Sequence, residues 1–175
     1  GGVCERAPSG ASAAWAQVRA KGVNPLPVAG HTSLALGTKL YLFGGEQGSG
    51  APKPGASLFV LETGGMRHWT LVELAGTTPT PRKLHSLSLA GNRLFVMFGQ
   101  SLRDGTPLGD VYVCNTSVMR AWSRPRLSGR APSPRYLHSA TVLGESVYVF
   151  GGIDADGAEL GDFYVMDAGG SAWAE

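Results

Sequence analysis

The stretch "SPRYLHSATVLGESVYVFGG", residues Ser133–Gly152, sets the pattern by which the rest of the chain can be interpreted. It holds two short runs rich in apolar and β-branched residues, with a turn between them and two glycines at the end. Such runs between turn residues predict β-strands. Two other stretches follow the same order, "HTSLALGTKLYLFGG" from His31 and "RKLHSLSLAGNRLFVMFGQ" from Arg82. The chain therefore consists largely of copies of one β-rich unit.

The copies recur with a period slightly above 50 residues. Four tryptophans mark it at intervals of 54, 53 and 51 residues: Trp15, Trp69, Trp122 and Trp173. Three histidines each follow a tryptophan by 16 residues: His31, His85 and His138. Glycines follow the histidines by 13 or 14 residues: Gly44, Gly45, Gly99, Gly151 and Gly152. In the second copy we expect Gln100 to replace the second glycine. A fixed period of this size predicts a solenoid or a propeller.

Each period contains four segments with strand composition, separated by glycine, proline, asparagine and aspartate. In the best-defined copies they are His138–Leu143, Ser146–Gly151, Asp162–Asp167 and Trp122–Leu127. The links between the first two segments are short enough for β-hairpins. Four antiparallel strands per repeat correspond to one propeller blade.

The order of motifs resembles the kelch repeat. Pro-x-Pro-Arg, x-x-His-Ser, Tyr-Val-Phe-Gly-Gly, Gly-Asp-x-Tyr-Val-x-Asp and a tryptophan follow one another, and the resemblance runs from about Trp15 to Trp173. It implies an all-β fold, a kelch-type β-propeller with about three four-stranded antiparallel blades plus a partial N-terminal blade. The expected divisions are the end of a preceding blade (1–20) and three kelch blades (21–73, 74–127 and 128–175).

Three blades form an incomplete ring, because a closed propeller has about four to eight. An open arc would expose two apolar blade faces, and large apolar patches mark interfaces. We therefore expect the chain to be a fragment of a longer kelch protein. The alternative is that copies of the chain, or other chains, complete the ring.

Composition limits the class of protein. The 175 residues carry a net charge of +2, too small to favour nucleic acid, and no apolar run approaches the roughly 18 residues of a membrane helix. Two cysteines, Cys4 and Cys114, do not form a disulfide framework. These features favour a cytoplasmic or nuclear protein. The glycosylation triplet at Asn115 leaves an extracellular location open.

The sequence contains no recognisable catalytic motif, so we expect neither enzymatic activity nor a cofactor in this chain. The loop Asp154–Asp162 concentrates four carboxylates, but their spacing differs from that of a calcium loop and indicates a solvated turn.

The repeated residues have expected structural roles. The tryptophans pack against a neighbouring blade, the paired glycines allow unusual backbone angles, and the histidines make hydrogen bonds at the strand nearest the propeller axis. Arg135 could pair with the carbonyls of the glycine turn or point outward to a ligand. The first copy lacks this arginine and has Ala56-Ser57 in place of Gly-Asp.

In the family that this chain resembles, the loops between second and third strands and those between blades form one binding face. The resemblance therefore implies a scaffold or adaptor that binds a protein partner. The alternative is an accessory propeller that positions the substrate of a larger enzyme. Arginine and tyrosine are frequent at the centres of protein interfaces. The expected partner contacts are Arg82, Lys83, Arg103, Arg135 and Tyr136.

Overall fold

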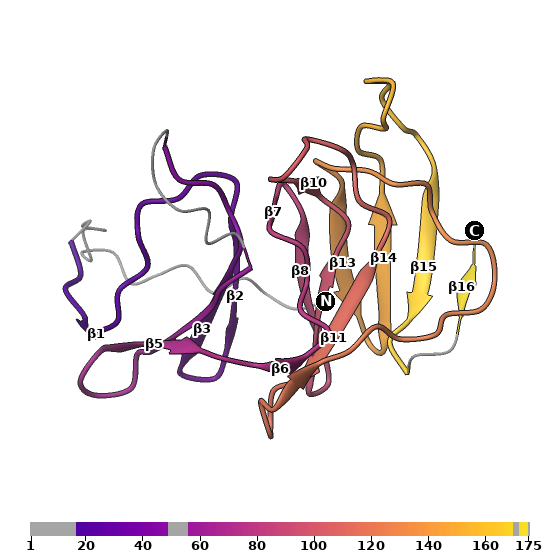
Figure 1. The fold of residues 1–175 in the computed structure, drawn as a ribbon. Helices are drawn as coiled ribbons and strands as arrows, with labels where there is room; N and C mark the ends of the chain where they lie inside the picture. The colour runs from indigo at the N-terminus through magenta and orange to yellow at the C-terminus, as the bar shows by residue number, and fades with distance from the viewer. Residues whose placement is uncertain (1–16, 49–55, 170–171, 175) are drawn as a thin grey trace, which may run out of the picture.

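The computed structural model describes residues 17–48, 56–169 and 172–174, and these form strands and turns without an α-helix. The described part therefore contains no helix that could cross a membrane. Figure 1 shows the main sheets side by side in an open arc, from indigo at one end to yellow at the other. They are the three blades of an incomplete propeller. The expected partial blade at residues 1–20 falls mostly outside the described residues, as does Trp15.

The strands of blade 1 are β1 (Lys21–Gly22), β2 (Thr32–Leu36), β3 (Lys39–Phe43), β4 (Leu58–Glu62) and β5 (His68–Val72). Those of blade 2 are β6 (Ala75–Gly76), β7 (Arg82–Lys83), β8 (Ser86–Ala90), β9 (Arg93–Met97), β10 (Gln100–Ser101), β11 (Val111–Asn115) and β12 (Ala121–Trp122). Those of blade 3 are β13 (Ser139–Leu143), β14 (Ser146–Phe150), β15 (Phe163–Asp167) and β16 (Trp173–Ala174).

The longer strands of each blade form an antiparallel meander, as in β13-β14-β15-β16, while the short strands β1 and β6 pair in parallel with the outer strands β5 and β12. The first two strands are joined by two-residue turns that begin with Gly37, Gly91 or Gly144, whose φ angles lie between 57° and 61°. Glycine adopts these left-handed angles without strain, and such turns match the twist of a hairpin. The hairpins predicted from the sequence are therefore formed.

The fourth strand of blade 2 is shorter than the sequence predicts. We expected a strand over Trp122–Leu127, but β12 ends at Trp122 and only one further bridge, Val113 to Ser123, continues the pairing. Pro125 lies where blade 1 has Val72, counted from the tryptophans. Because proline has no N–H to donate, the chain leaves the sheet before it.

Two apolar clusters hold the arc together, one at each junction between blades. At the first, Phe43 and Leu58 of blade 1 pack with Tyr112 and Trp122 of blade 2. At the second, residues of blade 2 pack with residues of blade 3; they are Phe95, Met97 and Val111 on one side and Val149, Tyr164, Met166 and Trp173 on the other. Blade 2 thus presents one apolar face to blade 3 and the opposite face to blade 1. Successive side chains of a strand point to opposite faces of the sheet. Both faces are apolar here because both sets of side chains are apolar.

The histidine-led strands are the inner ones, where neighbouring blades meet. β8 contacts both β2 and β13. Backbone hydrogen bonds join the turns before these strands, from Leu84 N to Gly30 O (2.9 Å) and from Leu137 N to Leu84 O (3.0 Å). Leu84 and Leu137 have φ angles of 54° and 59°, which are uncommon for leucine. The junction between blades therefore holds these residues in a strained conformation.

The glycine pair of blade 2 is not arranged as we predicted. Phe98, with φ 55°, occupies the position of Gly44 and Gly151, and Gly99 occupies the position of the second glycine. The backbone bonds agree, because Phe98 N donates to Asp110 O as Gly151 N donates to Asp162 O. It is therefore the first glycine that is replaced, by phenylalanine. Tight packing against His138 (5.1 Å between ring centroids) and Trp173 (6.0 Å) accompanies this strained angle.

Candidate functional site: the loop face

The loop face consists of two kinds of segment in each blade, the loop between the second and third strands and the linker that enters the inner strand. A short antiparallel pairing joins them in every blade. Ala29 pairs with Glu46 in blade 1, β7 pairs with β10 in blade 2, and Tyr136 pairs with Ile153 in blade 3. Backbone hydrogen bonds thus fix the described parts of these loops to each other.

In blade 2 a buried arginine lies beneath this pairing. The Arg82 side chain is 0% exposed and donates to Thr80 O (3.0 Å) and Phe98 O (2.8 Å). It also donates to both carboxylate oxygens of Asp110, at 2.6 and 3.1 Å. The guanidinium carbon lies 5.4 Å from the centre of the Tyr112 ring. This ion pair fastens the linker to the start of the third strand.

Blade 3 repeats the arrangement. Arg135 is also 0% exposed and donates to Ser133 O (3.0 Å) and Gly151 O (3.0 Å). Its guanidinium forms a bidentate pair with Asp162, with the longer bond at 2.8 Å. The hydrogen bonds from Arg135 hold the pKa of Asp162 below its usual value. We call each arginine–aspartate pair a clamp.

The clamps change the expected role of the two arginines. We predicted that Arg82 and Arg135 contact a partner, but both side chains point inward and neither reaches the surface. Of the two roles expected for Arg135, the structure shows the first, a bond to a glycine-turn carbonyl. Buried arginines that satisfy carbonyls and a carboxylate position the loops rather than touch a ligand.

Blade 1 has neither member of the clamp. Val28 and Ser57 occupy the positions of the arginine and the aspartate, counted from the histidine and the third strand. A cavity of about 50 Å³ lies there, lined by Val28, Leu42, Ser57 and Phe59 among others. Blade 1 therefore lacks both the arginine and the aspartate, and a void lies near the place that the guanidinium fills in blades 2 and 3.

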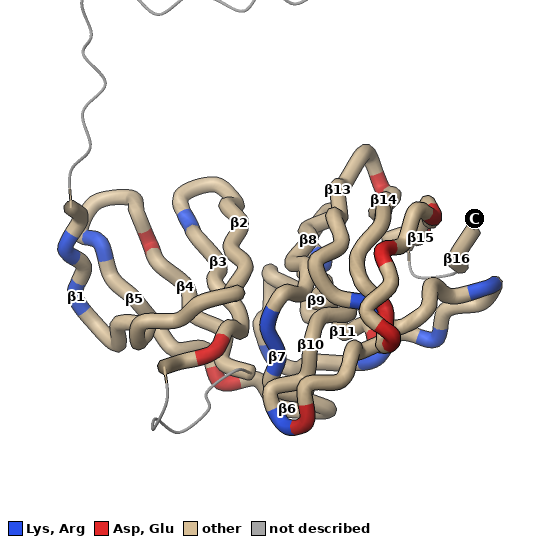
Figure 2. The backbone as a smooth tube through the Cα atoms, turned by 90° about the horizontal axis from the view of Figure 1, so that it is seen from above, with Lys and Arg blue, Asp and Glu red and all other residues tan. Residues whose placement is uncertain are grey.

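The other three predicted contact residues lie at the surface of the loop face. Arg103 is exposed, and Lys83 and Tyr136 are half-buried. Lys83 forms an ion pair with Glu46 of blade 1 (2.6 Å), which links the loops of two blades. Figure 2, seen from above, shows basic and acidic positions interspersed along the loops of blades 2 and 3. The exposed charge is thus mixed in sign.

Arg103 projects from a loop that is ordered by its own side chains. Ser101 Oγ accepts a bond from the N–H of Arg103 (3.2 Å), and Asp104 accepts from the N–H and hydroxyl of Thr106 (3.2 and 2.9 Å). Hydrogen bonds, led by that from Ser101, lower the pKa of Asp104. The loop therefore holds its shape without a partner.

The acidic loop of blade 3 is organised as a turn. Asp154 Oδ1 accepts backbone bonds from Asp156 (3.0 Å) and Ala158 (2.9 Å). Within residues 17–48, 56–169 and 172–174, no three His, Cys, Asp or Glu side chains come together as a metal site.

The histidines bond to hydroxyl groups of the preceding blade. His85 Nε2 lies 2.7 Å from Thr32 Oγ1, and His138 Nε2 lies 2.8 Å from Ser86 Oγ. Burial lowers the pKa of His85 to about 3 and that of His138 to about 4, with smaller contributions from nearby arginines. Both rings are therefore neutral near pH 7, and they join blades rather than transfer protons.

Two features of the repeat were missed by the sequence reasoning. One is the pairing of each Pro-Arg with the Gly-Asp 27 or 28 residues later, as in Arg135 with Asp162. The other is the glycine of a Gly-x-x-Pro-x-Pro motif, present in all three copies as Gly22, Gly76 and Gly129. A Cβ on any of them would lie 2.2–2.4 Å from a tryptophan carbonyl oxygen. The regular spacing of this motif in the sequence could have revealed the glycine.

Comparison with known proteins agrees with this geometry. The model of the "KLHDC2/KLHL20/DRC7 Kelch-repeats domain" matches residues 9–152, and the "Kelch motif" matches residues 134–175. "Host cell factor" of Drosophila melanogaster is 36% identical over 146 residues, which is 75% of this chain and 10% of that protein. "Host cell factor 1" of Homo sapiens is 34% identical over 79% of this chain and 8% of its own length.

Two further matches extend the comparison. "Rho GTPase-activating protein gacHH" of Dictyostelium discoideum is 33% identical over 86% of this chain and 10% of that protein. The solved structure titled "Structure of YjhT" superposes with a TM-score of 0.68 at 17% identity, covering 86% of this chain and 51% of that one. The chain thus spans about a tenth or less of these curated relatives and half of the solved structure. It belongs to the kelch-repeat family of β-propellers.

Proposed function

We propose that this chain is part of a protein-interaction module that binds a protein partner through the loop face. Family membership supports an interaction role, and the shared segment occurs in proteins with different names, such as "Host cell factor" and "Rho GTPase-activating protein gacHH". A segment that forms a tenth of each relative is typical of a module used in several contexts.

The observation that carries the proposal is the double fastening of the loops. In blades 2 and 3 each loop is paired with its linker through the backbone and is clamped from below by a buried arginine. Loops held in one conformation lose little entropy when they bind. Rigid scaffolds that present loops are a common basis for recognition.

The proposed contacts are Arg103, Lys83 and Tyr136. Arg103 offers an exposed guanidinium, which can form bidentate bonds with a partner's carboxylate. Lys83 has Glu46 as its present partner, so a ligand acid would compete for it. Arg82 and Arg135 support this surface as positioning residues.

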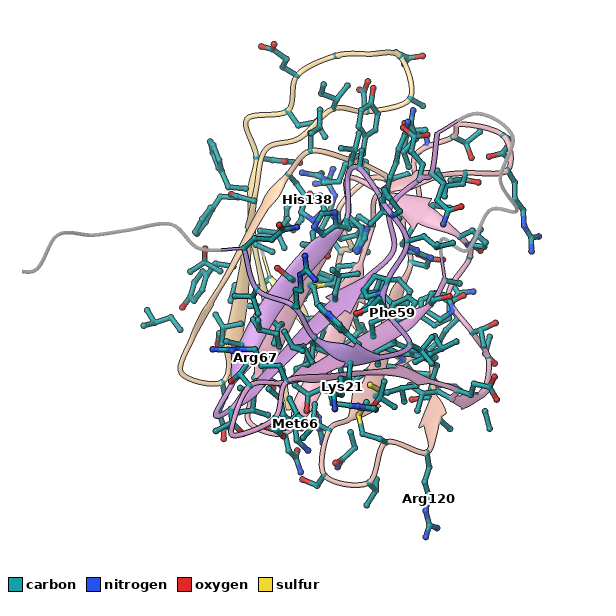
Figure 3. The ribbon with its side chains drawn as sticks, turned by 90° about the vertical axis from the view of Figure 1, so that its left-hand side faces the viewer. Lys21, Phe59, Met66, Arg67, Arg120 and His138 are labelled. Atoms are coloured by element: carbon teal, nitrogen blue, oxygen red, sulfur yellow. The ribbon has the colours of Figure 1, made fainter. Side chains whose placement is uncertain are left out.

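The test compares two substitutions with equal charge change. Arg103→Glu alters the loop face, whereas Arg120→Glu alters a turn between third and fourth strands, where Figure 3 shows Arg120 projecting away from the sheets. Both side chains are exposed, so neither change should affect folding. Partners captured by the intact protein are identified by quantitative mass spectrometry after cross-linking.

We expect Arg103→Glu to reduce recovery of a specific partner at least tenfold, and Arg120→Glu to leave it unchanged. Tyr136→Ala should weaken the binding of the same partner. If the partners survive Arg103→Glu and Tyr136→Ala but are lost with Arg120→Glu, the binding surface lies at the opposite end of the blades.

A further inference from the structure

A groove of about 330 Å³ lies where blades 1 and 2 meet, at the end of the blades opposite the loop face. Its floor is formed by strands β3, β4 and β5 of blade 1. Thr116 and Met119, in the turn after β11 of blade 2, form a wall. Sites for small molecules are typically concave, have volumes of about 300–1,000 Å³ and combine apolar surface with a few polar groups. The groove is at the lower end of this range in size.

A row of three ionisable side chains crosses the floor of the groove. Strand register places Lys39 beside Glu62, and Glu62 beside His68. The Cβ atoms of such cross-strand neighbours are about 5 Å apart. Hydrogen bonds from the Thr38 hydroxyl and the Gly64 N–H hold the pKa of the Glu62 carboxyl below its usual value. The charge of Lys39 acts in the same direction. The groove thus presents a carboxylate directly beside an ammonium group.

The adjacent row of the floor adds two hydroxyl groups and an apolar side chain. Tyr41, Val60 and Thr70 lie side by side on the same face of the sheet. Tyr41 is 3% exposed, and burial raises the pKa of its hydroxyl, which therefore stays protonated near pH 7. No hydrogen bond joins the hydroxyl of Tyr41 or Thr70 to another described residue. Both hydroxyls are therefore available to a ligand, beside the apolar surface of Val60.

The wall of the groove is held in place by hydrogen bonds within blade 2. The N–H and the hydroxyl of Thr116 both donate to Asn92 O, at 2.8 and 3.1 Å. Met119 N donates to Asn115 O (2.8 Å), and Met119 has a φ angle of 44°, which is uncommon for methionine. A wall that is ordered before binding loses little entropy when a ligand arrives. The thioether of Met119 adapts well to apolar ligands of different shape.

The charged row is not a feature of the repeat. In blade 2, Arg93 occupies the position of Lys39, and its guanidinium donates to Ala168 O of blade 3 (2.8 Å). The other two positions of the row hold Asn115 and Ala121 in blade 2. The equivalent arginine therefore joins two blades, whereas the lysine of blade 1 faces an open groove. This difference favours a role for the groove that the fold itself does not require.

We propose that the groove binds a small zwitterion with an apolar side chain, which is the chemistry of a free α-amino acid. Its carboxylate bonds to the Lys39 ammonium and the Tyr41 hydroxyl, and its ammonium group bonds to Glu62. Its side chain packs between Val60 and Met119. The two charges of an amino acid lie on neighbouring atoms, so they match opposite charges on neighbouring strands. An anion without an ammonium group would meet the Glu62 carboxylate, and a cation without a carboxylate would meet Lys39.

The test measures the binding of radiolabelled L-leucine to the intact protein by equilibrium dialysis, with analogues as competitors. N-acetyl-L-leucine lacks the ammonium group, L-leucinamide lacks the carboxylate, and N-acetyl-L-leucinamide lacks both. We expect each analogue to compete at least about tenfold more weakly than unlabelled L-leucine, because each loses a hydrogen bond between charged groups. The doubly blocked analogue should compete most weakly.

Substitutions locate the site. Lys39→Met and Glu62→Gln should each weaken the binding of L-leucine at least about fivefold. Arg103→Met removes an equal charge from the loop face and should leave this binding unchanged, which separates the groove from the proposed partner site. Lys39 is exposed and Glu62 lies at the end of a strand, so the melting temperatures should stay close to that of the unchanged protein.

Three outcomes would overturn the proposal. One is the absence of saturable binding up to about 10 mM L-leucine, since weaker binding carries little specificity. Another is equal competition by N-acetyl-L-leucinamide, which would show that the groove takes up apolar groups without recognising the zwitterion. The third is unchanged affinity in Lys39→Met and Glu62→Gln, which would place the site elsewhere in the protein.

Discussion

Removing the carboxylate of Asp110 tests whether the clamp stabilises the fold as its geometry indicates. The Arg82 side chain is 0% exposed and that of Asp110 is 13% exposed, and two bonds of 2.6 and 3.1 Å join them. Asp110→Ala would leave a guanidinium buried with carbonyl acceptors but no opposite charge. Breaking a buried ion pair in this way costs about 3–5 kcal/mol, so we expect a loss of that size in the free energy of unfolding.

A double-mutant cycle separates the pair from its surroundings. Arg82→Met removes the charge that Asp110 compensates, so the double variant Arg82→Met/Asp110→Ala contains no unpaired buried charge. We expect it to lose about 2 kcal/mol less than the sum of the single losses. Urea unfolding followed by circular dichroism gives the three values, provided that the denaturant slope is the same in each.

The control is the equivalent position in blade 1. Ser57 occupies the place of Asp110 but has no arginine beside it, so Ser57→Ala should change stability by less than about 0.5 kcal/mol. If Asp110→Ala costs less than about 1 kcal/mol, or if the single losses simply add, the clamp contributes little and the loop face is held by its backbone pairing alone.

Three further predictions follow from other parts of the structure. The double substitution Val28→Arg/Ser57→Asp builds the missing clamp in blade 1. The melting temperature of the double variant should exceed that of either single variant, because each single change introduces an unpaired charge. If the three melting temperatures are equal, the cavity cannot accept the pair. His85 and His138 have pKa values lowered to about 3 and about 4, so both stay neutral in the folded protein while the unfolded chain binds protons below pH 6.5. Stability, measured by urea unfolding, should therefore fall between pH 6.5 and 4, by up to about 1.4 kcal/mol per pH unit for each histidine, and a flat profile would contradict the assignment. Burial raises the pKa of the Cys114 thiol to about 12. In a variant whose other cysteine is replaced by serine, the folded chain should therefore be alkylated at pH 8 on the order of a thousandfold more slowly than the chain unfolded in urea. Fast alkylation of the folded chain would refute this.

The repeat itself could be predicted from the sequence because its signals are local. The alternation of apolar residues and the glycines of the hairpin turns indicate where each strand begins and ends, and these signals lie within about 15 residues of each other in the chain. The spacing of the tryptophans and histidines then predicted about three blades within this chain. The histidine-led strand was also predicted to lie nearest the propeller axis, and the structure places it there, where β8 contacts both β2 and β13.

Whether the arginine side chains point inward or outward depends on residues that are far away in the chain. Arg82 is followed by a lysine and preceded by a proline, which suits an exposed loop as well as a buried pair. Only the fold brings Asp110 to it, across 28 residues. In the same way, Phe98 can adopt a left-handed angle because His138 and Trp173 of the next blade pack against it. The sequence pattern alone favours glycine at such a position.

The sequence by itself therefore determined the repeat and most of its strands, because these follow from short-range alternation and a fixed period, while the resemblance to the kelch motif implied the propeller and its incomplete ring. Tertiary structure alone decided which repeated polar residues are buried and which remain at the surface. It places Arg82 and Arg135 inside and leaves Arg103 exposed, because burying a charge requires a partner, and that partner is supplied by another strand.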